Sequence, residues 1–194
     1  MRGGGWGGGR HALRGCVYPH PVPPRIGEGT RLLAWSLMSY TTQGTLALDR
    51  LGIAYALHPY DYDPEAPRVG LAAAEALGID PSQTFKTLML EVDGKPVCAI
   101  IPADMEASLK KVAAVFGGKS AQMMKVPDAE RLSGYKVGGI GPFGQKRQVP
   151  TAFDETLELW DRVYINAGQR GLLLSIAPAD AVRAAGGKIA DLTA

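Results

Sequence analysis

The segment FKTLMLEVDGKPVCAIIP, residues 85–102, consists of two apolar runs with Asp93-Gly94 between them. An Asp-Gly pair between apolar runs is typical of a tight turn that joins two strands. The segment therefore predicts an antiparallel hairpin with strands at 85–92 and 96–102.

Patterns on both sides of this hairpin predict the remaining elements. A short amphipathic helix carries Leu46, Leu48 and Leu51 and stops at Gly52. Further helices are expected at 68–77, 108–116, 127–133 and 178–185. Further strands are expected at 53–57, 149–153, 163–166, 172–176 and 189–192, with a glycine-rich strand and loop at 135–144. Strands outnumber those of a regular βαβ repeat, so the expected fold class is α/β (α+β), with a mixed, largely antiparallel, curled sheet flanked by helices.

Residues 1–37 differ in composition from the rest of the 194-residue chain. They contain nine glycines, four prolines, five arginines and one acid, Glu28. Such a segment buries too little apolar surface to offset chain entropy, so we expect it to be disordered and place one domain at 38–194. An acid-poor leader with arginines is compatible with an organelle transit peptide. The alternative, which we favour, is that translation starts at Met38.

The charge of the expected domain gives no general sign of a nucleic-acid partner. Without the five arginines and Glu28, the 21 basic and 19 acidic residues become 16 and 18, a net charge of −2. Any RNA contact therefore requires a local basic patch, and no DNA partner is expected. Cys98 is the one cysteine of the domain, which excludes a disulfide framework and fits a cytoplasmic location. The apolar run 32–38 is too short to span a membrane, so no membrane partner is expected.

The expected domain has few residues for nucleophilic catalysis. His58 is its one histidine, and a surface position at the end of a strand, before Pro59, competes with a catalytic role. One cysteine and one histidine are too few for a zinc site, so neither a metal nor a cofactor is expected. Any chemistry then depends on lysine, hydroxyl groups and backbone amides.

Lys86 is notable because it interrupts an apolar strand. A hydrated ammonium group is unfavourable there unless it reaches an anion or the edge of the sheet. Strand alternation sorts the residues into two faces: Lys86, Leu88 and Leu90 on one, and Phe85, Thr87 and Met89 on the other. A lysine that extends to solvent from the end of the strand and a lysine that binds an anion explain the residue equally well.

The loop GGIGPFGQKR, residues 138–147, has the spacing G-x-G-x-x-G. A dinucleotide site needs a helix to begin at the end of that motif, and Pro142 interrupts it here. The glycines still suit either a ligand that approaches bare backbone or a bulged corner of a curled sheet. Phosphate contacts, with a solvated face as the alternative, are available from Lys136, Lys146, Arg147 and Arg170.

Three motifs together resemble the YbaK family of Cys-tRNA(Pro) deacylases. They are FKTL at 85–88, GYKVGGIGPFGQK at 134–146 and GQRGL at 168–172. They occur in the family's order, and the resemblance runs from about Thr42 to Asp191. It implies a mixed, partly closed, barrel-like sheet shared with the editing domain of bacterial prolyl-tRNA synthetases. It also implies that mischarged aminoacyl-tRNA is cleared, typically cysteine on tRNA(Pro), with the substrate's own thiol as nucleophile and a cyclic thiolactone as product.

The resemblance also implies roles for individual residues. Lys86 would fix the terminal adenosine or its phosphate, and the backbone of Gly138 and Gly139 would face the ester. The implied substrate-binding residues are Tyr60, Thr87, Tyr135, Gly141, Pro142, Asn166, Gly168 and Arg170. Positioning and oxyanion stabilisation would suffice, because an aminoacyl ester is already activated and an intramolecular thiol has a high effective concentration.

Two residues depart from the family pattern. Asn166 stands where the best-known deacylases have serine, and Leu173 where they have aspartate. Both positions border the family's pocket, so a small amino acid such as alanine competes with cysteine as the preferred one. The implied partners are the acceptor end of mischarged tRNA and prolyl-tRNA synthetase. A non-catalytic paralogue that binds tRNA or a nucleotide, and an enzyme for another activated acyl ester, remain alternatives.

Overall fold

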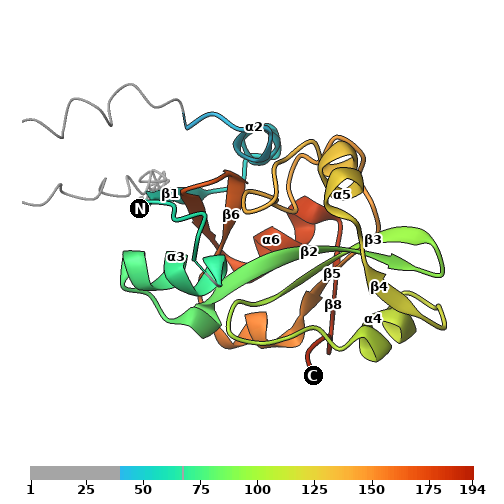
Figure 1. Cartoon of the computed structure of the whole chain (residues 1–194). Coiled ribbons are helices and arrows are strands. Elements are labelled where there is room, and N and C mark those ends of the chain that lie inside the picture. The colour runs from blue at the N-terminus through green and yellow to red at the C-terminus, as the bar shows by residue number, and fades with distance from the viewer. Residues whose placement is uncertain (1–39, 67) are drawn as a thin grey trace, which may run out of the picture. The chain divides into compact units, whose positions relative to one another are not determined.

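A computed structural model describes residues 40–66 and 68–194 (Figure 1), so the expectations for residues 1–37 lie outside the described residues. Its centre is one eight-stranded sheet with the order β1-β7-β6-β2-β3-β5-β8, in which β4 also pairs with β2. The strands are β1 Tyr55–Pro59, β2 Thr84–Val92, β3 Lys95–Pro102, β4 Ala121–Met123, β5 Thr151–Asp154, β6 Val163–Gln169, β7 Leu172–Ile176 and β8 Lys188–Ala190.

Helices connect most of these strands. The α-helices are α2 Gln43–Arg50, α3 Val69–Leu77, α4 Leu109–Val115, α5 Val126–Ser133 and α6 Pro178–Ala185, and the 3₁₀ helices are η1 Pro81–Gln83 and η2 Glu155–Leu159. Thr42 caps α2 in a capping box with Thr45, and left-handed glycines end α3, α5 and α6. Within the described residues, no helix is long and apolar enough to cross a membrane.

The predicted hairpin is confirmed. Val92 of β2 pairs with Lys95 of β3 across a two-residue turn. Asp93 and Gly94 adopt φ of +48° and +76°, the positive values that such a turn requires. The Asp93 carboxylate also accepts hydrogen bonds from the backbone N–H groups of Lys119 and Ser120, which ties the turn to the segment before β4.

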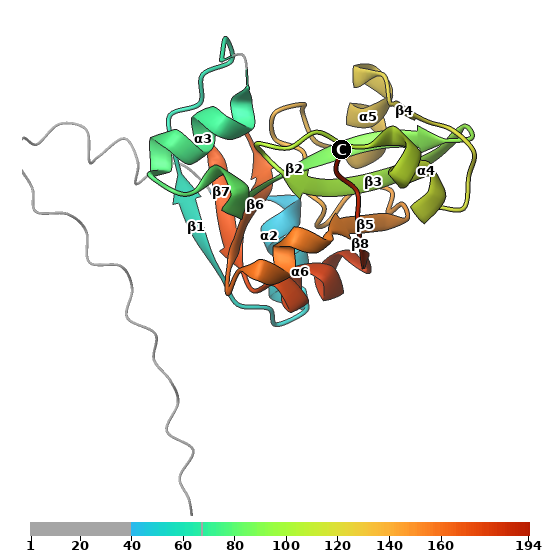
Figure 2. The same cartoon turned by 90° about the horizontal axis from the view of Figure 1, so that it is seen from below.

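The sheet is mixed, as predicted. β1, β7 and β6 are antiparallel neighbours, and β2 is antiparallel to both β3 and β4. The pairs β2/β6, β3/β5 and β5/β8 are parallel. Figure 2 shows the strands from β1 to β8 turning about one another, so that the sheet forms a curled half-barrel and the expected fold class is confirmed.

The two faces of β2 and β3 enter different hydrophobic clusters. Phe85, Met89 and Ile100 pack in the larger cluster, which also takes buried residues from α2, α5 and α6. Leu90 and Ile101 pack in a second cluster against α4. The alternation predicted for β2 is therefore confirmed, and each face of the hairpin has its own helical cover.

One predicted element is wrong. Residues 135–144 form turns without a strand. Tyr135, Ile140 and Phe143 are buried in the larger cluster, so this segment fills the core with side chains instead of extending the sheet. β4, η1 and η2 were not expected from the sequence, and β8 lies slightly before the strand expected at 189–192.

Candidate functional site

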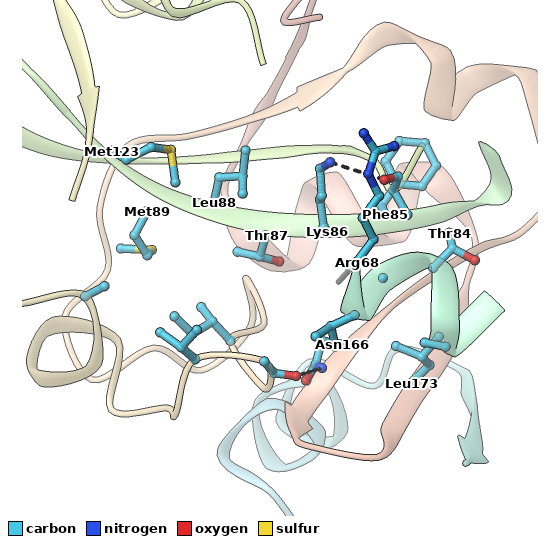
Figure 3. A pocket seen from close by; sticks show the side chains of 18 of the residues that line it. Arg68, Thr84, Phe85, Lys86, Thr87, Leu88, Met89, Met123, Asn166 and Leu173 are labelled. Carbon is cyan, nitrogen blue, oxygen red and sulfur yellow. Dashed lines mark hydrogen bonds between the residues drawn. The ribbon is translucent and has the colours of Figure 1, made fainter. Parts of the chain in front are cut away.

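The cavity that joins the sequence-predicted residues lies at an open edge of β2. β6 pairs only with Thr84 and Phe85, at the start of β2, and β4 pairs only with 90–92, at its end. Within residues 40–66 and 68–194, no strand lies beside the middle of β2, residues 86–89, on that side. A cavity of about 380 Å³ opens there, and Lys86, Thr87, Gly138 and Asn166 are among its lining residues (Figure 3).

The backbone of Thr87 is directed towards this open edge. In an antiparallel strand, each residue directs both its N–H and its C=O to one side, and the side alternates from one residue to the next. The Thr84 carbonyl accepts the Ala103 N–H beside β3, whereas the Met89 carbonyl accepts the Met124 N–H on the other side. Thr87 lies two residues before Met89 in the same strand, so its N–H and C=O also face this side, in the gap between β6 and β4.

The hydroxyl group of Thr87 adds an unused polar atom to the same place. Its Oγ1 is buried, and no hydrogen-bond partner for it exists among the described residues. A buried hydroxyl without a partner costs about 1–3 kcal/mol, so such an atom is expected to find its partner in a ligand or water. Thr87 therefore lines the cavity with its backbone groups directed to the open edge, beside a hydroxyl group whose hydrogen-bonding capacity is unused.

Lys86 lies on the other face of β2. Figure 3 shows its side chain beside Arg68, on the side of β2 opposite to Thr87. The Lys86 Nζ donates to the backbone carbonyls of Ala103 and Met105, at 3.2 and 2.6 Å. Burial, and then the nearby Arg68 charge, lower the pKa of Lys86, while Glu106 and Asp104 act in the opposite direction. The cavity follows the open edge and so reaches both faces.

Asn166 holds the glycine loop against β6. Its Nδ2 donates to the Gly138 carbonyl at 3.1 Å, and its Oδ1 accepts the Gly168 N–H at 2.8 Å. Gly138 has φ of +87°, and a Cβ added there would stand 2.5 Å from the Tyr62 hydroxyl. One side chain thus fixes two glycines on different segments, which makes Asn166 a positioning residue.

The expectation that Gly139 presents its backbone to a ligand is corrected. Its N–H donates to the Lys136 carbonyl at 2.8 Å inside the loop, and the residue is absent from the cavity wall. A Cβ on Gly139 would stand 2.9 Å from the Arg170 nitrogen, so the glycine permits two chain segments to pack closely. Of the two glycines, only Gly138 lines the cavity.

Four of the other expected site residues support the loop without lining the cavity. Tyr135 is in the core, where its hydroxyl donates to the Phe143 carbonyl at 2.6 Å and burial raises its pKa to about 12. Gly168 packs beside the Tyr135 ring. Arg170 donates to the Val137 carbonyl at 2.8 Å. Pro142 is buried in the loop. The expectation that Tyr135 lines the pocket is corrected, since its ring fills the core.

Gly141 also serves the contact between the loop and β6. A Cβ at this position would collide with the carbonyl oxygen of Asn166. Tyr60, by contrast, lines the cavity, and Leu173 and Ala73 pack beside it. That end of the cavity is apolar.

Neither His58 nor Cys98 belongs to the cavity wall. His58 Nε2 lies 2.9 Å from the Ser175 Oγ, and burial, together with the Arg162 charge, lowers the pKa of the imidazole. Cys98 is fully buried, which raises the pKa of its thiol to about 12. Within the described residues, no group of three or more His, Cys, Asp or Glu side chains is placed to hold a metal.

The cavity contains residues that the sequence did not single out. Arg68 and Glu106 line its charged end, and several methionines line other parts of the wall. The lining methionines are Met89, Met105, Met123 and Met124. An arginine after a proline and scattered methionines carry no local signal, because only the fold brings them together.

Replacing Asn166 by alanine or aspartate tests its role. Alanine loses both hydrogen bonds, whereas aspartate keeps an acceptor for the Gly168 N–H and loses the donor to Gly138. We expect Asn166→Ala to lower the free energy of unfolding by about 1–3 kcal/mol. We also expect amide hydrogen exchange at Gly168 to accelerate in Asn166→Ala and to remain slow in Asn166→Asp. Slow exchange in both variants would contradict the positioning role.

Comparison with known proteins gives consistent similarities. A family model described as an aminoacyl-tRNA editing domain matches residues 63–184. A candidate Cys-tRNA(Pro)/Cys-tRNA(Cys) deacylase, EbsC of Enterococcus faecalis, is 37% identical over 124 residues, which cover 63% of this chain and 75% of EbsC. The multifunctional Ser/Thr-tRNA deacylase ProXp-y of Escherichia coli is 30% identical over 119 residues, 59% of this chain and 71% of that protein.

Two further similarities concern part of a larger enzyme and a solved structure. The proline–tRNA ligase of Maridesulfovibrio salexigens is 35% identical over 72 residues, 37% of this chain and only 12% of the ligase. The crystal structure of a candidate trans-editing enzyme for prolyl-tRNA synthetase superposes with a TM-score of 0.70 at 22% identity, over 78% of this chain and 95% of that one. The structural likeness supports the fold.

Proposed function

Because this chain belongs to the aminoacyl-tRNA editing domain family, we propose that it is a free-standing deacylase that clears mischarged tRNA, with Cys-tRNA(Pro) as its main substrate. Residues 38–194 form the proposed editing domain. The observation that carries the proposal is the single cavity that Lys86, Thr87, Gly138 and Asn166 share. The residues come from three separate segments of the chain, and the fold brings them to one place.

The proposed chemistry needs no nucleophile from the protein. The thiol sulfur of the bound cysteinyl group attacks its own ester carbonyl. A C–S bond forms, the C–O bond to the ribose breaks, and the thiol proton ends on the released ribose oxygen. The product is a thiolactone and free tRNA. The buried location of Cys98 and the absence of His58 from the cavity wall support a role for the protein in positioning alone.

Thr87 is the proposed donor to the developing oxyanion. Its N–H faces the open edge of β2, and its hydroxyl is buried without a partner among the described residues. The N–H of Gly139 is engaged with Lys136 and the carbonyl of Gly138 with Asn166, so the glycine loop shapes the wall instead. Donors fixed before the substrate arrives stabilise charge without reorganisation.

The apolar end of the cavity sets the proposed amino-acid preference. The side chains of Leu173 and Ala73 offer no polar group, and the buried Tyr60 packs in the same cluster. A short side chain that needs no hydrogen bond fits such a wall. The name of EbsC supports cysteine. The name of ProXp-y supports serine and threonine as competitors.

The proposed partner is the acceptor end of tRNA, in the cytoplasm. The net charge of −2 on residues 38–194 predicts weak affinity for tRNA alone, so a prolyl-tRNA synthetase that presents the charged end is a second proposed partner. Of the basic residues near the loop, Lys136 is paired with Glu130 at 2.8 Å and Arg170 donates to a carbonyl. Lys146 and Arg147 are exposed and better suited to phosphate contacts.

A panel of charged tRNA(Pro) molecules tests the proposal. Cysteine, serine, alanine and proline are attached in turn, and release of free tRNA is measured under single-turnover conditions. We expect Cys-tRNA(Pro) to be cleaved and the seryl, alanyl and prolyl substrates to be left intact, because only cysteine carries a thiol. Release from none of the four would contradict the proposal and favour a non-catalytic binding module.

A further inference from the structure

The charged end of the cavity lies between the start of α3 and the turn that follows β3. Arg68 and Glu106 stand there, and Lys86 reaches the same end from β2. The Arg68 Nη2 is 3.9 Å from the Glu106 Oε1, and the two side chains are 62% and 81% exposed. An ion pair so long and so exposed contributes little stability, so a stronger anion can displace it.

The positive charges of Arg68 and Lys86 at this end of the cavity are only weakly neutralised by their neighbours. The two carbonyls that bind the Lys86 Nζ satisfy two of its three protons and carry no full charge. Burial, and then the nearby Arg68 charge, disfavour the charged form of Lys86, and the carboxylates of Glu106 and Asp104 act in the opposite direction. Two cations that face one cavity attract an anion more strongly than either does alone.

The start of α3 contributes a third favourable feature. Arg68 is the N-cap residue of α3, and its side chain makes no capping hydrogen bond. Val69 and Gly70, the first two helical residues, line the cavity. The N–H groups at the start of a helix have no partner within the helix, and the helix dipole favours negative charge there. These features add to the two side-chain charges.

We propose that Arg68 and the start of α3 extend the position of Lys86 into a phosphate subsite for the terminal nucleotide of the tRNA, with Glu106 as a placeholder that the phosphate displaces. This inference rests on the proposed function. The subsite lies on one face of β2, and Thr87 and Gly138 lie across the open edge. A nucleotide that passes over the edge has its phosphate at Arg68 and its ester at Thr87.

Binding of 5′-AMP and of adenosine, measured by calorimetry at low ionic strength, tests the subsite. The two probes differ only in the phosphate. We expect Arg68→Ala to weaken AMP binding by about five- to tenfold and to leave adenosine binding unchanged. We expect Glu106→Gln to tighten AMP binding by about two- to fivefold, since the competing carboxylate is gone. Arg131→Ala, which removes an exposed arginine paired with Asp128 outside the cavity, is the matched control and should change neither.

Each contrary result has a definite meaning. Equal AMP binding by wild type and Arg68→Ala, or an equal loss for AMP and adenosine, would overturn the subsite. If Glu106→Gln binds AMP no more tightly than the wild type, the placeholder role of Glu106 is overturned. These measurements do not depend on deacylation. A chain that binds AMP through Arg68 but releases no amino acid from tRNA would refute the proposed function and leave the subsite intact.

Discussion

Replacing Lys86 by alanine lowers kcat/KM for Cys-tRNA(Pro) by about 10- to 100-fold, the cost of one lost hydrogen bond to a charged group. The same change has little effect on Tm. Burial lowers the pKa of Lys86, so folding disfavours its charged form, and removal of the charge relieves that cost. The relief offsets the two hydrogen bonds lost at Ala103 and Met105. Single-turnover deacylation and thermal unfolding of the same preparation measure the two effects.

The control for this variant is Lys110→Ala, because Lys110 is exposed on α4 and is absent from the cavity wall. It should change neither the rate nor Tm. A Lys86→Ala protein with wild-type kcat/KM would show that Lys86 is structural. A large fall in both Tm and activity would show that the hydrogen bonds of Lys86 to the two carbonyls stabilise the fold.

Replacing Gly141 by alanine lowers both stability and activity. The added Cβ collides with the Asn166 carbonyl, which is backbone and cannot rotate away. The loop and β6 must separate, and Asn166 then loses its hold on Gly138. We expect a loss of about 3 kcal/mol in the free energy of unfolding. That corresponds to a fall in Tm of about 6–12 °C, measured by calorimetry.

Gly52→Ala separates this collision from ordinary glycine effects. Gly52 has φ of +63°, and a Cβ there meets nothing within 4 Å. Its replacement costs only the strain of the left-handed conformation, about 1 kcal/mol, and should leave deacylation unchanged. A Gly141→Ala protein as stable and active as Gly52→Ala would contradict the role assigned to the contact between the loop and β6.

Local patterns were sufficient to predict much of the fold. The Asp93-Gly94 turn and the alternation along β2 follow from two neighbouring segments, and both are confirmed. Residues 135–144 were expected to include a strand because they mix apolar residues with glycine. Whether such a segment pairs or packs depends on the space left by distant elements. β4 is only three residues long and gives too weak a signal to predict.

The site was less predictable than the fold because its defining feature is a missing neighbour. The gap beside Thr87 exists because β6 and β4 pair with opposite ends of β2, and both are far from β2 in sequence. The sequence resemblance indicated Lys86, Thr87 and Gly138. It did not indicate Arg68 and Glu106, whose importance depends on where α3 begins. Tyr135 was misplaced because an aromatic residue beside a glycine motif is equally suited to a pocket wall and to the core.

The central claim is that the cavity positions an ester that the substrate's own thiol cleaves. Cys-tRNA(Pro) and 2-aminobutyryl-tRNA(Pro) test it most directly, because the second replaces the thiol by a methyl group of similar size. Deacylation of both is measured under single-turnover conditions with the wild-type protein. We predict rapid release of tRNA from the cysteinyl substrate and none above background from the aminobutyryl substrate. Equal rates for the two would contradict the claim and show that water is the nucleophile.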